Sequence, residues 1–204
     1  MEMTGNKKVV RVFSIGNMAK IAIFSALAGV LMLFKFPIPI APAFMTVDFG
    51  DVATLVSGFV LGPISGIITV IMKNLINIVL DGTMTAYVGE LSNIIVGSTF
   101  VGVSSYIYSK NKTRKSAIIG LIGGIVAMTI LATLSNYFVI FPIYAKVMHI
   151  DLEGFVKFAP KFVKSYNQLI VLSVIPFNLV KGSLNAIVTL IVYKKISRYF
   201  KNMR

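Results

Sequence analysis

Two lysines lie inside long apolar segments of this sequence, and asparagines flank each lysine at helical spacing: Lys73 with Asn74 and Asn77, and Lys181 with Asn178 and Asn185. A charged side chain near the centre of a membrane helix costs roughly 2.5–3.5 kcal/mol on insertion scales, so such residues usually face a protein interior or an aqueous cavity. We therefore expect a membrane protein with a polar binding site.

Further polar residues interrupt the neighbouring apolar segments toward the same side of the membrane: Glu90, Ser92, Asn93 and Asn136. Amides both donate and accept hydrogen bonds, which suits a neutral ligand rich in hydroxyl and carbonyl groups better than a free ion or phosphate. Aromatic residues beside these positions could stack on a flat ring: Phe44, Tyr87, Tyr137, Phe138 and Phe177. The alternative for both sets is packing within the bundle, where an interhelical hydrogen bond is worth about 0.6 kcal/mol.

The residue types exclude several kinds of chemistry. The sequence has no cysteine and one histidine, His149, so it offers no disulfide and no thiolate or imidazole metal centre. It has no glycine-rich phosphate loop followed by Lys-Ser/Thr, so energy from ATP would have to come from another polypeptide. No nucleophile and base can be paired, and no basic stripe is interleaved with aromatics. We expect no enzymatic activity, no metal, no cofactor and no nucleic-acid partner.

The apolar segments predict the elements that position these residues. The chain has 204 residues, of which 56% are hydrophobic and 13% charged, and the apolar residues come in long blocks. We expect one transmembrane substrate-binding domain over residues 1–204. Its fold class is an all-α bundle of six helices near 17–35, 51–61, 63–80, 86–108, 114–141 and 168–194, the second too short to cross alone. The prolines of residues 36–42 predict a non-helical loop over the ligand site.

The basic residues predict the orientation of the helices. Lys and Arg outnumber Asp and Glu by 20 to 7. Most lie in three clusters: Lys7, Lys8 and Arg11 before the first helix, Lys110, Lys112, Arg114 and Lys115 after the fourth, and Lys194, Lys195, Arg198, Lys201 and Arg204 after the sixth. An even number of helices puts the clusters on one side, which the positive-inside rule makes cytoplasmic. We expect a multi-pass cell-membrane protein with both termini in the cytoplasm, and residues 145–166 lying flat at the outer interface.

Small residues four positions apart mark one face of the first helix. Ala22 and Ala26 would allow another helix to approach closely, either within the chain or in a second membrane protein. The spacing alone favours packing within the chain.

Short motifs along the sequence resemble, in order and spacing, the riboflavin-binding substrate subunits of energy-coupling factor (ECF) transporters, the RibU family. They are Lys35-Phe-Pro37, Val47-Asp-Phe-Gly-Asp51, Leu61-Gly-Pro63, Lys73-Asn74, Asn93, Asn136-Tyr-Phe138 and Ile175-Pro-Phe-Asn-Leu-Val-Lys-Gly182. Together they cover nearly the whole chain.

The resemblance implies an S component, a membrane subunit that captures riboflavin from the outer side beneath the loop between its first two helices. Such a subunit works with a transmembrane coupling protein (EcfT-like) and two cytoplasmic ATPases (EcfA-like). The Ala22–Ala26 face resembles the motif through which these subunits meet the coupling protein, and this shifts our expectation for it to a partner surface.

The motifs also imply ligand contacts, namely Asn93, Asn136, Asn178 and Lys181, with loop 44–51, Tyr137 and Phe138 closing around the flat ring. With the aromatic residues above, the expected ligand-binding set is Phe44, Asp48, Tyr87, Asn93, Asn136, Tyr137, Phe138, Asn178 and Lys181. Lys73 has a structural interpretation, in which it pairs with Asp48 or Asp51 and fastens its helix to the loop.

Two other functions remain open from the residues alone. One is an S component with the same architecture for another vitamin or small heterocycle. The other is a stand-alone carrier or channel that uses Glu90 and the aspartates as ion ligands.

Overall fold

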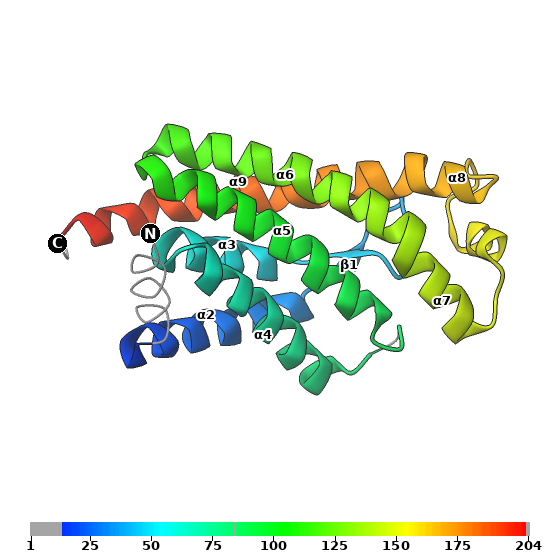
Figure 1. The fold of residues 1–204 in the computed structure, drawn as a ribbon, viewed down its shortest axis with the longest axis horizontal. Helices are drawn as coiled ribbons and strands as arrows, with labels where there is room; N and C mark the ends of the chain where they lie inside the picture. Colours follow the sequence, from blue (N-terminus) through cyan, green and yellow to red (C-terminus); the bar gives the residue numbers. More distant parts are fainter. Residues whose placement is uncertain (1–13, 84, 203–204) are drawn as a thin grey trace, which may run out of the picture.

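The computed structural model describes residues 14–83 and 85–202, and most of that length is helical. The helices in chain order are α2 (Ile15–Leu33), α3 (Gly50–Leu61), α4 (Pro63–Asp81), α5 (Val88–Asn111), α6 (Arg114–Ser135), α7 (Phe141–Met148), α8 (Tyr166–Leu169) and α9 (Ile175–Asn202). The shorter elements are strands β1 (Phe36–Pro37) and β2 (Thr46–Val47), the π-helical segments η1 (Asn136–Ile140) and η3 (Ile170–Val174), and the 3-10 helix η2 (Leu152–Phe158). Figure 1 shows the start of α2, the α5–α6 turn and the end of α9 at one end of the bundle, with α7 and α8 at the other.

Five helical segments are long and apolar enough to span a membrane: Ile15–Leu33, Pro63–Asp81, Val88–Asn111, Arg114–Met148 and Tyr166–Tyr193. Helix α3 is also apolar but has 12 residues, or about 18 Å of helix, which is too short to cross alone. Together they form the all-α, six-helix membrane bundle that the sequence predicts.

The chain between α2 and α3 is the predicted non-helical loop. Its two ends pair as antiparallel strands, Phe36 with Val47 and Pro37 with Thr46. The prolines between them lack amide donors, so this stretch cannot join a helix. Past α3, Gly62 has a φ of 105°, a conformation that favours glycine, and it turns the chain directly into α4.

Two of the long helical segments contain a π-helical turn shortly before a proline. Segment η1 precedes Pro142 and segment η3 precedes Pro176. A proline ring inside an α-helix clashes with the carbonyl four residues earlier, and the wider π turn accommodates it. The predicted end of the fifth helix at residue 141 was therefore wrong, because the helix continues through Pro142 to Met148.

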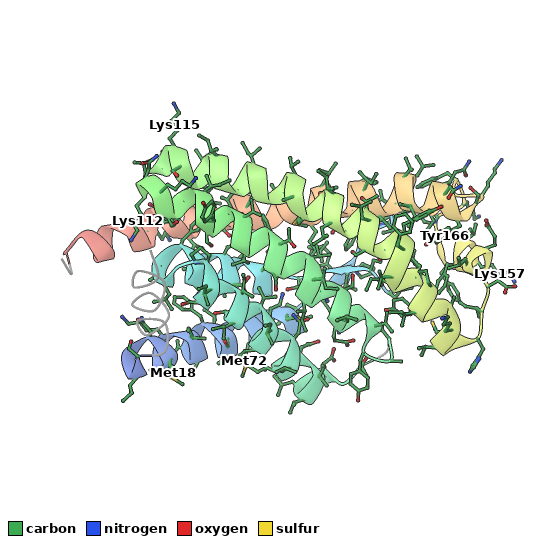
Figure 2. All side chains as sticks on the ribbon, viewed as in Figure 1. Met18, Met72, Lys112, Lys115, Lys157 and Tyr166 are labelled. Carbon is green, nitrogen blue, oxygen red and sulfur yellow. The ribbon has the colours of Figure 1, made fainter. Side chains whose placement is uncertain are left out.

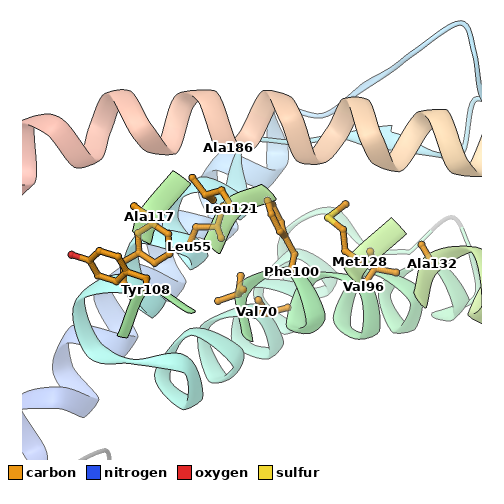
Figure 3. Close-up of a cluster of buried hydrophobic side chains, with 12 residues drawn as sticks. Leu55, Val70, Val96, Phe100, Tyr108, Ala117, Leu121, Met128, Ala132 and Ala186 are labelled. Atoms are coloured by element: carbon orange, nitrogen blue, oxygen red, sulfur yellow. The ribbon is translucent and has the colours of Figure 1, made fainter. Parts of the chain in front are cut away.

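A hydrophobic core joins α3, α4, α5, α6 and α9 (Figure 3). Leu55, Val70, Phe100 and Leu121 at its centre are each at most 1% exposed. Because lipid is as apolar as these side chains, close packing and not the hydrophobic effect favours their association.

Helix α2 has two faces of small residues that differ in exposure. Ser25 and Gly29 are buried against the bundle, and a methyl group on Gly29 would lie 2.5 Å from Ile76 Cγ2 on α4. Ala22 and Ala26 are exposed. The close approach of α2 to α4 therefore uses Gly29 and leaves the predicted Ala22–Ala26 face uncovered.

The basic clusters were predicted to lie on one side of the membrane, and the basic residues that the structure describes agree with this. Lys112 and Lys115 lie at the end of the bundle where α9 also ends, and Lys157 lies at the opposite end (Figure 2). Other members of the clusters fall outside the side chains that the structure describes: Lys7, Lys8, Arg11, Lys194, Arg198, Lys201 and Arg204.

Candidate functional site

A cavity of about 80 Å³ lies among the β2 end of the loop, α3, α5, α6, η1, α7 and α9. Its lining residues are Phe44, Met45, Thr46, Asp51, Gly89, Ser92, Asn93, Val96, Gly97, Phe100, Met128, Asn136, Ile140, Tyr144, Phe177, Asn178 and Lys181. Polar groups thus meet from four separate parts of the chain, among walls that are otherwise apolar and aromatic, as is common in ligand sites.

Asn136 and Asn178 are held in a fixed orientation by their own helices. Asn136 Nδ2 donates to the Ala132 carbonyl at 2.8 Å, and Asn178 Nδ2 donates to the Val174 carbonyl at 2.8 Å. A carbonyl accepts only from a donor, so the amide nitrogen must face it and the amide oxygen must face away. No described residue donates to either Oδ1. Each side chain therefore offers the cavity a hydrogen-bond acceptor.

Lys181 and Asn93 supply the donors. Lys181 Nζ donates to Asn93 Oδ1 at 3.3 Å, which fixes the Asn93 amide with its Nδ2 group free to donate. The ammonium also donates to Asp48 Oδ2 at 3.2 Å. Because an ammonium has three N–H groups, one remains for a ligand in the cavity.

A buried quartet of charges lies at the floor of the cavity, made of Asp48, Asp51, Lys73 and Lys181. Lys73 Nζ lies 2.5 Å from Asp51 Oδ1 and 3.4 Å from Asp48 Oδ1, which confirms the expected pairing of Lys73 with these aspartates, Asp48 in the loop and Asp51 at the start of α3. Burial disfavours the charged form of Asp48, but the ammonium groups of Lys73 and Lys181 outweigh it and lower the pKa of Asp48 from 3.8 to about 2. The quartet is electrically balanced, so the floor favours a neutral ligand.

An aromatic wall closes the cavity on the side of α7. Phe44 and Tyr144 line the cavity and also line a second, smaller one of about 50 Å³ on their other side. Their ring centroids are 5.7 Å apart, and Phe155 packs against both. Phe44 thus separates the two cavities.

The structure brings five of the nine expected ligand-binding residues to one cavity, namely Phe44, Asn93, Asn136, Asn178 and Lys181. Asp48 does not line the cavity: it is 2% exposed and pairs with Lys181, which does line it. Tyr87 is 61% exposed at the start of α5, while Tyr137 and Phe138 are 37% and 68% exposed. Residues one and two positions after Asn136 point away from the face that Asn136 occupies, because only residues three or four apart share a helix face.

Several lining residues were not expected from the sequence. Met128, Ile140 and Tyr144 line the cavity together with Asn136, and all four lie at multiples of four positions along one helical segment. The same spacing from Asn93 reaches Gly89 and Gly97 on α5. Extending the helical spacing from each asparagine would have found them.

Glu90 does not line the cavity. Its Oε2 accepts hydrogen bonds from Thr83 Oγ1 at 3.2 Å and Thr85 Oγ1 at 2.9 Å in the turn before α5. Among the described residues, no group of three acidic, histidine or cysteine side chains could hold a metal ion. Glu90 has a structural role in this turn.

Comparison with known proteins identifies the family. The sequence model of the family described as "ECF transporter, substrate-specific component" matches residues 16–193 of the 204 in the chain. The chain belongs to this family. Membership confirms the resemblance inferred from the motifs and makes the chain a transport component and not an enzyme.

Relatives of this ECF component carry the name riboflavin transporter. RibU of Staphylococcus aureus (strain TCH60) is 35% identical over 184 residues, which cover 90% of this chain and 91% of that protein. FmnP of Bacillus subtilis (strain 168) is 29% identical over 186 residues, covering 90% and 93%. A solved structure described as the S component of a bacterial ECF transporter superposes with a TM-score of 0.72 at 32% identity, covering 97% of this chain and 99% of that one.

Proposed function

We propose that this ECF component captures riboflavin in the cavity and delivers it for uptake. The observation that carries the proposal is the pattern of donors and acceptors: free Oδ1 atoms on Asn136 and Asn178, and free N–H groups on Asn93 and Lys181. The flavin ring has an imide edge with one N–H between two carbonyls, and it pairs with one acceptor flanked by donors. The second acceptor and Ser92 would serve the ribityl hydroxyls. The names of the relatives favour the same ligand.

The cavity must enlarge to hold a ligand of this size. Its volume of about 80 Å³ is below the roughly 150 Å³ of an engineered cavity that binds benzene. The floor is a buried ion quartet and cannot recede without separating charges. We therefore place the movement on the loop that carries Phe44, Met45 and Thr46, and on the aromatic wall behind it.

The proposed partners are an EcfT-like transmembrane coupling protein and two EcfA-like cytoplasmic ATPases. The exposed Ala22–Ala26 face of α2 supports docking of the coupling protein, because small residues let a partner helix approach closely. We place both termini in the cytoplasm, since the α5–α6 turn and the end of α9 share one end of the bundle and both are rich in Lys and Arg in the sequence. The cavity then faces the outside.

Quenching of riboflavin fluorescence by the purified, detergent-solubilised protein tests the proposal. We expect saturable quenching in the absence of ATP and of any partner protein. Competition with other vitamins distinguishes riboflavin from another heterocycle, and the lack of saturable quenching would overturn the assignment.

A further inference from the structure

Lys73 lies beside the ligand cavity without reaching it. Its side chain is 1% exposed, and no described residue of α4 lines the cavity. Its Nζ nevertheless lies 2.5 Å from Asp51 Oδ1, and Asp51 does line the cavity. We infer that Lys73 is a positioning residue for ligand capture, which keeps the ammonium of Lys181 available to the ligand. The inference rests on the function proposed above.

The charges of the buried quartet balance one another. Two carboxylates and two ammonium groups are buried together, with side chains between 1% and 7% exposed. Water cannot screen these charges well, so removal of one member leaves a buried charge without compensation, which is strongly unfavourable. Without Lys73, both carboxylates depend on Lys181 alone.

Lys181 lies close enough to Asp51 for its ammonium to move toward this carboxylate if Lys73 is removed. Its Nζ lies 3.6 Å from Asp51 Oδ2, just beyond hydrogen-bond distance, and 3.3 Å from Asn93 Oδ1 on the cavity wall. If Asp51 loses Lys73, its full charge attracts the Lys181 ammonium toward the floor. That movement weakens the bond that orients Asn93 and withdraws the N–H that the cavity would offer to a ligand.

Lys73 also supports the junction between the loop and α3, at the floor of the cavity. A methyl group on Gly50, the first residue of α3, would lie 2.8 Å from Lys73 Cδ and 2.6 Å from the Ala28 carbonyl, so the backbone of this junction packs directly on the lysine stem. Asp48 Oδ1 accepts from the Gly50 amide at 2.9 Å and lies 3.4 Å from Lys73 Nζ. The same ammonium thus holds the end of the loop that carries Phe44, Met45 and Thr46.

A charge-balanced variant separates this role from simple packing. Lys73→Met removes the charge but keeps a long apolar side chain, and it leaves the quartet with one excess negative charge. Adding Asp51→Asn restores the balance while removing one more native contact. If Lys73 has a purely structural role, the double variant should bind riboflavin more weakly than Lys73→Met does. If Lys73 positions Lys181, the double variant should bind riboflavin more tightly than Lys73→Met does.

The experiment measures riboflavin binding by fluorescence quenching for the parent, Lys73→Met, Asp51→Asn, the double variant and Lys73→Arg. We expect Lys73→Met to weaken binding at least ten-fold, the double variant to bind within about three-fold of Asp51→Asn, and Lys73→Arg to fall between the parent and Lys73→Met. Amide hydrogen exchange over residues 44–50 without ligand gives a second readout. Exchange over these residues should be faster in Lys73→Met than in the parent, and slower in the double variant than in Lys73→Met.

Each outcome bears on one claim. If the parent protein does not quench riboflavin fluorescence, riboflavin is not the ligand, and hydrogen exchange over residues 44–50 then decides the role of Lys73. A parent that binds riboflavin, with Lys73→Met equal to it, overturns the inference. So does a double variant that fails to fold or that binds no better than Lys73→Met. If Lys73→Met alone does not fold, recovery of folded, binding protein in the double variant supports the inference.

Discussion

Lys181 on α9 and Asp48 in the loop before α3 form a buried ion pair, with Nζ 3.2 Å from Oδ2, across 133 positions of the chain. The pair joins the last long helix to the loop that covers the cavity. Because Asp48 also pairs with Lys73, its carboxylate is the point at which α4, α9 and the loop meet.

The low pKa of Asp48 predicts a dependence of stability on pH. The pKa is lowered from 3.8 to about 2 in the folded state, so the stabilisation is complete above pH 4 and is lost as the pH falls from about 4 to about 2. At neutral pH it amounts to on the order of 2 kcal/mol. Thermal unfolding in detergent at pH 7, 5 and 3 should show a gap between the parent and Asp48→Asn that is constant from pH 7 to 5 and narrows at pH 3.

Asp151 is exposed and supplies the control for this measurement. The gap between the parent and Asp151→Asn should stay small throughout. A gap for Asp48→Asn that already closes near pH 6 would contradict the prediction.

Asn136 and Asn178 should each be needed for capture. Alanine at either position removes an acceptor and leaves a ligand donor unpaired, which costs about 1–3 kcal/mol, or roughly 5- to 150-fold in affinity for riboflavin. Asn167→Ala is the matched control, because Asn167 is exposed on α8 in the same helical segment as Asn178. Equal affinities for Asn167→Ala and Asn178→Ala would remove Asn178 from the site.

Phe44 should control the release of ligand. Phe44→Ala opens the wall between the two cavities and removes ring contacts to Tyr144 and Phe155. We expect riboflavin to dissociate about ten-fold faster, with a smaller change in association, because changes at one interface act mostly on dissociation. Stopped-flow quenching measures both rates, and Phe162→Ala, at an exposed phenylalanine, is the control. Unchanged dissociation would mean that Phe44 is not part of the barrier.

Ala22 and Ala26 should matter for transport and not for capture. Tryptophan at either position projects from the exposed face of α2 and prevents close approach of a coupling protein. We expect loss of riboflavin uptake in cells with unchanged quenching by the purified protein. Val126→Trp, on the exposed face of α6, is the control and should leave uptake intact. Uptake at the parental level in Ala22→Trp would exclude this face as the docking surface.

Much of the fold follows from the length of the apolar segments and the position of the prolines. The break at Gly62 and Pro63 and the proline-rich loop both lie where the sequence places them. The end of the fifth helix could not be read in the same way, because Pro142 usually ends or kinks a helix. It is tolerated here by the π turn η1, and a proline alone does not tell whether the helix ends or continues through such a turn.

The site was partly predictable for a related reason. Asparagines inside apolar segments are costly unless they face polar partners, so Asn93, Asn136 and Asn178 stood out and lie on one cavity. Aromatic side chains occur both on lipid-facing surfaces and in binding sites, so the residue type alone does not predict which way such a side chain points. Tyr144 faces the cavity while Phe138 is exposed, and only the rotation of the helix decides between them.

The two π turns also decide where this site can lose a residue. Each π turn contains one residue more than an α-helical turn would need. Deleting a single residue from 136–140 or 170–174 would restore α-helical turns and leave the two halves of that helix in nearly the same rotation, but it would bring back the clash of Pro142 or Pro176 with the carbonyl four residues earlier. A deletion in the α-helical part has no wide turn to absorb it and would rotate one half against the other by about 100°. After a deletion between Asn178 and Lys181, for example, these two side chains would no longer share a helix face.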